Sequence, residues 1–393
     1  MRFSLTAHPI VAICLICSII FLSGCESVSK KESAPLIYHK DQTSAIKFIA
    51  NNLATQITPS SVSSAKHIPI DLFFNGHSAE EAVSSKAIQQ QLIAELSASM
   101  PNGTFVPLNT KTIQNAQWVA LASYTVAKSE QTGKSGNWVR LNVVLAEIKS
   151  GTSVAQASTY LDAKQFDGAP SRFYKDAPMY LSDASHQDRT DVIAGKKRSL
   201  GDRLQSRAEL GEAIDAYESG KYADAENRFK KIVGVNSRDT AALSGLYQTL
   251  WSQNKKAEAE RVFSQLASTG IEAGKLSVKI LFKLGTTDFI DDGDIAQQYQ
   301  LWLRAIAKTV ADKKTCLDVT GHASASGASE YNEKLSLARA NRISSRMQQL
   351  APTIGRHMKA FGKGSLETIV GNMANDATDA IDRRVEFSVH SCD

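Results

Sequence analysis

The sequence carries little net charge and no extended block of like charge. Its 45 basic and 40 acidic residues leave a formal charge of +5 over 393 residues, and the basic residues are scattered apart from the triplet at residues 196–198. A protein that binds nucleic acid needs a basic face that meets the phosphates. Nucleic acid is therefore not expected as a partner. The 42% hydrophobic and 22% charged residues are typical of globular domains rather than of a disordered chain.

Residue patterns of the common enzyme classes are also missing. There is no nucleophile, histidine and acid in a recognisable order, no paired-carboxylate context and no glycine-rich phosphate loop of the Walker type. Cysteine is scarce, and no Cys/His cluster has the spacing of a metal site. His77 lacks such neighbours and is interpreted as a surface residue. We therefore expect neither an enzyme nor a protein that needs a metal or another cofactor.

An apolar run near the N terminus is too short to cross a membrane. The run spans residues 10–22 and is preceded by Arg2. The sequence Leu-Ser-Gly-Cys begins at its last residue and ends at Cys25, and no hydrophobic stretch follows. A membrane-spanning helix needs roughly 20 apolar residues. Residues 1–24 are therefore interpreted as a cleaved secretion signal. The polar, aperiodic residues 25–42 that follow are expected to form a tether.

The four residues that end at Cys25 resemble the bacterial lipobox, the motif of lipoproteins that are cut before a lipid-modified cysteine. The resemblance implies acylation of Cys25, palmitate included, and Glu26 in place of Asp implies sorting to the outer membrane, facing the periplasm. Each acyl chain contributes about 0.8 kcal/mol per buried CH₂, so several chains would make a firm anchor. The alternative is an ordinary cleaved signal in which Cys25 is incidental.

Only two cysteines remain for the folded part. Cys14 and Cys17 leave with the signal and Cys25 carries lipid, which leaves Cys316 and Cys392. An even pair in an oxidising compartment suggests one disulfide. The alternative is two buried free thiols, because the sequence alone does not bring their Cα atoms within about 6 Å.

The region from residue 43 to 161 alternates helical and strand patterns. Two segments with helical apolar spacing, at residues 45–53 and 84–100, are followed by three strand-like runs that begin near residues 118, 138 and 153. The pattern predicts an α+β domain with an antiparallel portion. Its element order, Gly76 and a hairpin near residues 133–136 resemble the periplasmic domain of curli-export, flagellar and cell-wall-synthase-activator lipoproteins. That resemblance implies a periplasmic protein partner.

An internal repeat follows a connection, residues 162–198, that is expected to be irregular. The sequence ADAENRF at residues 223–229 recurs as AEAERVF 34 residues later, and Gly220 aligns with Asn254. This period resembles the tetratricopeptide repeat, a helix–turn–helix unit that stacks on its neighbours. Residues 199–270 are thus expected to form a short helical pair of repeats that leans on a flanking domain. Its role is either a groove for a peptide or protein, or a rigid spacer.

The last region, residues 276–393, alternates strands and helices. Strands are expected near residues 276–282, 316–323, 366–371 and 383–392, with helices at residues 294–310 and 332–350. The order predicts an α/β sandwich of helices on a mixed sheet. A Gly-His pair, a glycine six residues after the first one and the sequence Asn-x-x-Leu-Ser-x-x-Arg-Ala resemble the OmpA-like peptidoglycan-binding domain. The matching residues are Gly321, His322, Gly327, Asn332, Leu335, Ser336, Arg339 and Ala340.

This resemblance implies a site for the diaminopimelate unit of the peptidoglycan stem peptide. A guanidinium holds a carboxylate by two parallel hydrogen bonds, while an Asp receives the ligand's ammonium. Arg339 matches the guanidinium position, and Asn332 and Arg383 match other pocket positions. Ser324 stands where the family has Asp, and Asp379 and Asp382 also depart from the family pattern. Either the pocket binds the same ligand more weakly, or the fold is kept as a structural module.

The whole chain is thus expected to be an α+β multidomain protein. The first functional hypothesis is an outer-membrane lipoprotein that anchors the envelope to peptidoglycan. The second is a periplasmic assembly or regulatory scaffold for an envelope machine or cell-wall synthase, in which the OmpA-like domain is mainly structural.

Overall fold

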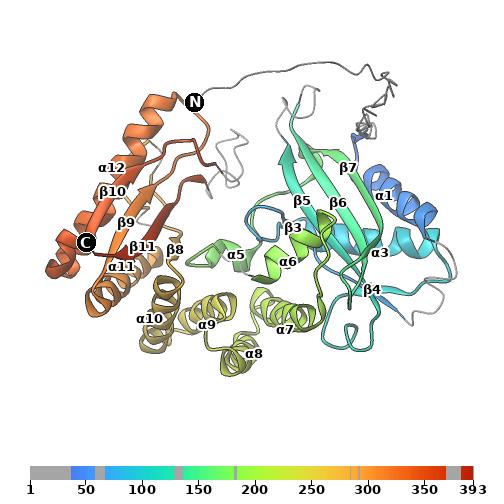
Figure 1. Cartoon of the computed structure of the whole chain (residues 1–393), viewed down its shortest axis with the longest axis horizontal. Helices are drawn as coiled ribbons and strands as arrows, with labels where there is room; N and C mark the ends of the chain where they lie inside the picture. The colour runs from blue at the N-terminus through green and yellow to red at the C-terminus, as the bar shows by residue number, and fades with distance from the viewer. Residues whose placement is uncertain are drawn as a thin grey trace, which may run out of the picture. The chain divides into compact units, whose positions relative to one another are not determined.

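The computed structural model describes residues 37–57, 67–127, 136–180, 184–283, 285–290, 293–368 and 382–392 (Figure 1). The chain divides into Met1–Pro35 and a compact unit, Leu36–Asp393, to which all described residues belong. The expected secretion signal, Cys25 and most of the expected tether lie outside the described residues. Helices and strands both contribute to the core, as expected for an α+β chain.

The first part of the compact unit is a mixed sheet in the order β1-β7-β6-β5-β2-β4, with β3 beside β5. Helices α1 (Gln42–Gln56) and α3 (Ser85–Ser99) bury their apolar residues in one core with this sheet. A second core on alternate residues of β5 and β6 includes Val192, Leu200 and Leu204. Because both sets of alternate residues are buried, β5 is a nearly continuous apolar run. The strands are β1 (Tyr38–His39), β2 (Ile68–Ile70), β3 (Phe74–Asn75), β4 (Phe105–Pro107), β5 (Trp118–Ala127), β6 (Trp138–Glu147) and β7 (Ser153–Asp162).

The end of the expected tether is part of this sheet. Tyr38 and His39 pair in parallel with Tyr160 and Leu161 of β7. The Tyr38 ring also stacks on Tyr160 and meets Trp138 edge-on. The folded part therefore begins before residue 43, which is the boundary expected from the sequence. Two aromatic contacts and a short parallel strand pairing hold this segment, although its sequence shows no helical or strand pattern.

The connection expected to be irregular contains two helices. After the single turn η1 (Ala163–Gln165) come α5 (Arg172–Asp176) and α6 (Ala184–Ile193). The prediction was wrong for α6 because its buried residues include His186, Arg189 and Asp191 beside a single large apolar side chain, Val192. A helix that is fixed by buried polar groups has no apolar stripe to reveal it.

The internal repeat consists of two antiparallel helix pairs. Equivalent residues of the repeat, Ala225 with Ala259 and Phe229 with Phe263, are all fully buried. Gly220 and Asn254 both take the left-handed backbone conformation, at φ 71° and 60°, which turns the chain between the helices of each pair. The helices are α7 (Gly201–Glu218), α8 (Tyr222–Val235), α9 (Thr240–Ser252) and α10 (Lys256–Glu272). Their kinship with tetratricopeptide repeats stays a prediction.

The last region is a four-stranded sheet in the order β10-β9-β11-β8, with α11 and α12 packed against it (Figure 1). Strand β11 is antiparallel to both β9 and β8, whereas β10 runs parallel to β9 at the edge. The elements are β8 (Lys275–Val278), α11 (Asp294–Lys313), β9 (Thr315–Gly321), α12 (Ser329–Leu350), η2 (Pro352–His357), β10 (Met358–Gly362) and β11 (Val385–Ser391).

One of the four expected strands is misplaced. The third strand is β10, not residues 366–371, of which Leu366 and Glu367 form a turn and the last three lie outside the described residues. Strand β10 contains Lys359 and Gly362 and is only half-buried, so its sequence lacks the β-branched run that usually marks a strand.

The helical repeats and the last region share one core. Phe263 of α10 stacks on Trp302 of α11 with ring centroids 5.8 Å apart, and Trp302 donates a hydrogen bond to the Tyr247 hydroxyl at 2.7 Å. Phe173 of α5 stacks on Phe229 at the other end of the same core. The short repeat therefore buries its apolar face against a neighbour, as its length requires.

Among the described residues, no helix combines the length and the apolar character that crossing a bilayer requires.

Candidate functional site

The residues that the sequence singles out gather where β9 ends and α12 begins. Gly321, the last residue of β9, lies so close to α12 that a Cβ there would be 2.1 Å from the Ser336 carbonyl oxygen. Only glycine permits this approach. The Ser336 hydroxyl accepts a hydrogen bond from the Gly364 amide, so the loop after β10 is fixed to the same turn of the helix.

Asn332 organises the loop that contains Ser324. Its buried side-chain amide donates to the carbonyl oxygens of Ser324 and Ser326, at 3.2 and 2.9 Å. The hydroxyls of the two serines are 3.0 Å apart and share a hydrogen bond. Asn332 therefore holds the loop in shape from the first turns of α12, and Ser324 is buried in that loop.

Arg339 lies about two turns after Asn332 on the same face of α12. It is almost fully buried, with 2% of its surface exposed. Its Nε donates to the Thr286 carbonyl oxygen at 3.0 Å, and Nη2 reaches the Lys283 carbonyl oxygen at 3.5 Å. The guanidinium also lies over the Phe282 ring, 5.0 Å from its centre. The segment before α11 therefore positions this side chain from the side opposite its own helix.

The charge of Arg339 is not balanced by an acid in the described part of the chain. No ion pair joins it to a described Asp or Glu. Burial, followed by the positive charge of Arg383, lowers its pKa to about 10, and Tyr331 opposes the shift. Arg339 therefore stays charged at neutral pH beside a second guanidinium. Two such groups at one point favour an anionic ligand, such as a carboxylate.

The pair of arginines before β11 has two roles. Arg384 is buried and bound to its own surroundings, since Nε donates to Glu386 at 2.8 Å and Nη1 donates to the Glu367 carbonyl oxygen at 3.2 Å. Arg383 is half-buried and acts on Arg339 through its charge. The structure thus brings Arg383 into the group with Arg339. Asp382 is fully buried, and Asp379 lies outside the described residues.

His322, the residue after β9, is buried in its neutral form. It is 1% exposed, and neither ring nitrogen has a hydrogen-bond partner among the described residues. Burial, and after it the charge of Arg384, lowers its pKa to about 4. The ring is therefore neutral at pH 7 and serves as a packing group at the base of the site.

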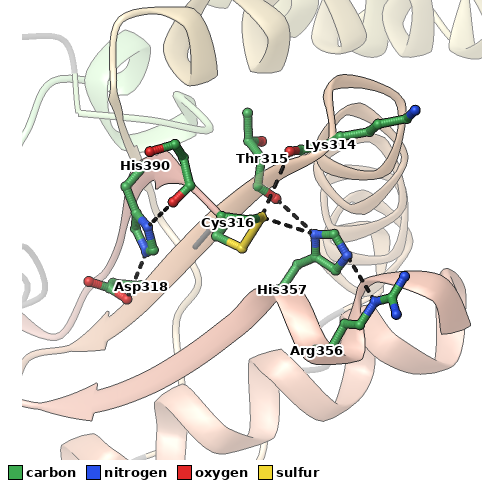
Figure 2. The surroundings of a disulfide bond; sticks show 9 residues. Lys314, Thr315, Cys316, Asp318, Arg356, His357 and His390 are labelled. Atoms are coloured by element: carbon green, nitrogen blue, oxygen red, sulfur yellow. Dashed lines mark hydrogen bonds and ion pairs between the residues drawn. A yellow bond between two sulfur atoms is a disulfide. The ribbon is translucent and has the colours of Figure 1, made fainter.

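The two cysteines of the folded part form the bridge that the sequence suggests. Cys316 Sγ and Cys392 Sγ are bonded at 2.14 Å, with their Cα atoms 5.1 Å apart (Figure 2). Cys316 is the second residue of β9, and Cys392 follows the last residue of β11, which pairs antiparallel with β9. The bridge thus lies at the end of β9 opposite Gly321. Sequence reasoning missed His357, whose ring lies beside Cys392.

Sequence reasoning also missed a buried ionic network in the first part of the fold. Asp71 accepts from Arg189 at 2.7 Å and lies 3.4 Å from Arg207, which also pairs with Glu81. All four side chains are buried. Burial raises the pKa of Glu81, against the charge of Arg207. The four residues lie far apart in sequence, so spacing gives no sign of the network.

Comparison with known proteins identifies one part of the chain. Residues 289–381 match the sequence model of the OmpA family. No curated protein matches the chain. The similar solved structures include the peptidoglycan-associated lipoprotein from Burkholderia pseudomallei, at 22% identity over 28% of this chain and 88% of that one, with a TM-score of 0.25.

Two other similar structures are a MotB periplasmic domain and a cell wall anchor. The periplasmic domain of Helicobacter pylori MotB is 20% identical over 30% of this chain and 76% of that one, with a TM-score of 0.26. The cell wall anchor of the T6SS from Pseudomonas aeruginosa is 26% identical over 30% of this chain and 81% of that one, with a TM-score of 0.25. The family match alone makes residues 289–381 an OmpA-family domain. It contains Ser324, Asn332 and Arg339 but ends before Arg383.

Proposed function

We propose that the OmpA-family domain binds the stem peptide of peptidoglycan through a carboxylate. The observation that carries the proposal is the charge of Arg339, which is buried beside Arg383 and has no ion pair with a described acid. A ligand carboxylate would supply the missing negative charge by two parallel hydrogen bonds. Asn332 holds the neighbouring loop in shape for the rest of the ligand.

Ser324 sets the strength expected of this site. Its hydroxyl is bonded to Ser326, so it offers a neutral partner where a carboxylate would meet the ligand's ammonium. A neutral hydrogen bond contributes less than a charge-assisted one. The proposed ligand is therefore held mainly by its carboxylate, and binding is weaker than in a pocket that has both charges.

A co-sedimentation assay with purified sacculi tests the proposal. The full chain is expected in the pellet, and free diaminopimelate-containing stem peptide is expected to release it. A chain that stays in the supernatant at every concentration would reject wall binding.

One observation favours the second candidate function, a scaffold in which the OmpA-family domain is structural. Arg339 is 2% exposed and bound to backbone carbonyls of its own chain, so the ligand must displace part of what covers it. The same domain shares a core with the helical repeats. In that case the repeats and the first sheet would engage a periplasmic protein machine, and sacculi would not retain the chain.

The proposed location is the periplasmic side of the outer membrane, with the lipid anchor at Cys25. The support is the lipobox-like sequence that ends at Cys25. A Cys25→Ala variant is expected to leave the membrane fraction and appear with soluble periplasmic proteins. Unchanged co-fractionation of the variant with outer membranes would reject the anchor, whatever the result with sacculi.

A further inference from the structure

A hollow of about 390 Å³ opens beside the disulfide, at the end of the sheet away from Arg339. It is lined by both cysteines, by two histidines and by basic side chains: Cys316, Cys392, His357, His390, Arg356 and Lys359. Cys392 is exposed and His357 is half-buried, so the hollow is open to solvent and to small solutes. The side chains that line the hollow have no part in the proposed wall binding.

Strand register brings the two cysteines and one histidine together. Strand β10 pairs with β9 so that Met358 lies opposite Leu317, which places the preceding His357 beside Cys316. Strand β11 pairs with β9 so that Ser391 lies opposite Thr315, which places Cys392 at the same corner. His357 Nδ1 is 3.3 Å from Cys392 Sγ, and the ligand atoms of all three residues lie within 4.8 Å of one another (Figure 2).

We infer that reduction of the disulfide turns this corner into a zinc(II) site. Its ligands are Cys316 Sγ, Cys392 Sγ and His357 Nδ1, and the fourth position faces the hollow. Two thiolates and an imidazole are the ligand set that zinc prefers. A tetrahedral zinc ion with ligand bonds of about 2.0–2.3 Å holds its ligand atoms about 3.5–3.8 Å apart. His357 Nδ1 is already 3.3 Å from Cys392 Sγ, so it needs to move by only a few tenths of an ångström to reach that separation.

Oxidation and zinc binding exclude each other at this site. A disulfide holds its two sulfurs about 2 Å apart, whereas zinc holds two thiolates nearly twice as far from each other. A dithiol reductant donates two electrons to the bond: its own two sulfurs become joined, and its two protons pass to the cysteines. Zinc then binds the two thiolates and releases those protons to solvent. The redox state of the bridge therefore decides whether the site exists.

The neighbours of His357 decide which ring nitrogen carries the proton. Arg356 Nε lies 3.4 Å from His357 Nε2, an arrangement in which Nε2 accepts and Nδ1 carries the proton. Zinc at Nδ1 requires the other tautomer, with Nε2 protonated. Arg356 is exposed and can turn into solvent, so the change is accessible. Removal of Arg356 is expected to strengthen zinc binding, because a competing contact and a positive charge are both lost.

The test measures zinc bound to the full chain before and after reduction. A phosphine is the reductant, since it is oxidised to its oxide with oxygen from water and adds no thiol that would compete for metal. The expected result is one extra zinc per reduced chain relative to the oxidised chain. The oxidised chain is the folded reference. Cobalt in place of zinc is expected to give a sulfur-to-metal charge-transfer band.

Three variants separate this site from adventitious binding. His357→Gln keeps the disulfide and is expected to weaken zinc binding to the reduced chain by about tenfold or more, because one of three protein ligands is lost. His390→Gln is the matched control in the same hollow: His390 is bonded to Asp318 and Ser391, and its variant is expected to bind like the wild type. Cys316→Ser with Cys392→Ser should lose the extra zinc.

Two results would overturn the inference. One is equal zinc binding by the oxidised and reduced chains, with the thiols of the reduced chain titrated to prove that the bridge is open. The other is a reduced His357→Gln chain that binds zinc as tightly as the wild type does. Either result assigns the bound metal to other residues.

Discussion

Arg189, Arg207 and Arg339 are buried to a similar degree but under different electrostatic conditions. Arg189 and Arg207, in α6 and α7, are 5% and 6% exposed and lie against Asp71, while Arg207 also pairs with Glu81. Arg339 in α12 is 2% exposed and has only backbone oxygens and an aromatic ring as partners among the described residues. The charges of the first two are balanced within the fold, whereas the third has no acid beside it among the described residues.

His322 shows a third way to bury a base. A histidine can release its proton, and the pKa of about 4 means that His322 does so at neutral pH. An arginine does not have this option, because even a pKa of about 10 leaves Arg339 charged. A buried arginine without an acid is therefore a stronger sign of a binding site than a buried histidine is.

Loss of Asp71 should have the largest effect on stability. Asp71→Asn keeps the shape of the side chain but leaves Arg189 and Arg207 less balanced, and breaking a buried pair costs about 3–5 kcal/mol. The free energy of unfolding in urea measures this cost. Asp188→Asn is the matched control, because Asp188 pairs with Arg203 at 3.2 Å on the surface. A surface pair contributes about 0–1 kcal/mol.

Similar costs for the two variants would contradict the comparison. The buried network would then be no more important to the fold than an exposed ion pair, and the balance of charge would not separate the first part of the chain from the OmpA-family domain.

Loss of Arg339 should have the largest effect on binding. Charge-assisted hydrogen bonds contribute about 1.5–3 kcal/mol, so Arg339→Ala is expected to weaken retention on sacculi by roughly ten- to more than a hundredfold. Arg342→Ala, at an exposed position of the same helix, is expected to bind like the wild type. A melting curve of each variant separates lost binding from lost folding. Equal retention of Arg339→Ala and the wild type would place the ligand elsewhere.

His322 should make the fold less stable in acid. Its pKa is about 4 in the folded chain, below the ordinary value near 6.5 of an unfolded chain. The unfolded state therefore binds a proton first, and stability falls as the pH drops from about 6.5 to 4. After allowance for solvent screening, the loss is about 2 kcal/mol. Urea unfolding at pH 7 and pH 4.5 should show a smaller difference in His322→Gln, and an unchanged difference would refute this assignment.

A carboxylate at position 324 should strengthen binding modestly. Ser324→Asp places a negative charge where the ligand ammonium is expected, and a gain of about 1 kcal/mol after desolvation corresponds to about fivefold tighter binding. Ser326→Asp, two residues away in the same loop, serves as the control for charge alone. If both variants bind like the wild type, the ammonium does not lie beside residue 324.

Much of the fold follows from local pattern. The strands β5, β6 and β7 and the helices α1, α3, α11 and α12 carry the apolar runs or stripes from which they were expected. Helix α6 and strand β10 were missed, because buried ion pairs fix the first and a half-buried sheet edge accommodates the second. Tertiary contacts of this kind leave no periodic trace in the sequence.

The candidate site was predictable in its members but not in its electrostatics. The motif points to Asn332 and Arg339, and the even pair of remaining cysteines to the bridge between Cys316 and Cys392. The carbonyl oxygens that hold Arg339 belong to residues 283 and 286, more than 50 positions away. His357 meets the cysteines only through the register of β10 on β9. Such contacts depend on the assembled sheet and therefore require the structure.

The proposed wall binding depends on a ligand carboxylate held by Arg339 and Arg383. The most direct test is calorimetric titration of the full chain with a diaminopimelate-containing stem peptide, compared with the same peptide whose diaminopimelate carboxyl group is amidated. Saturable binding of the first peptide is expected, with a loss of roughly tenfold or more in affinity for the second, because the charge-assisted pair is removed. Equal affinities for the two peptides, or no binding of either, would contradict it.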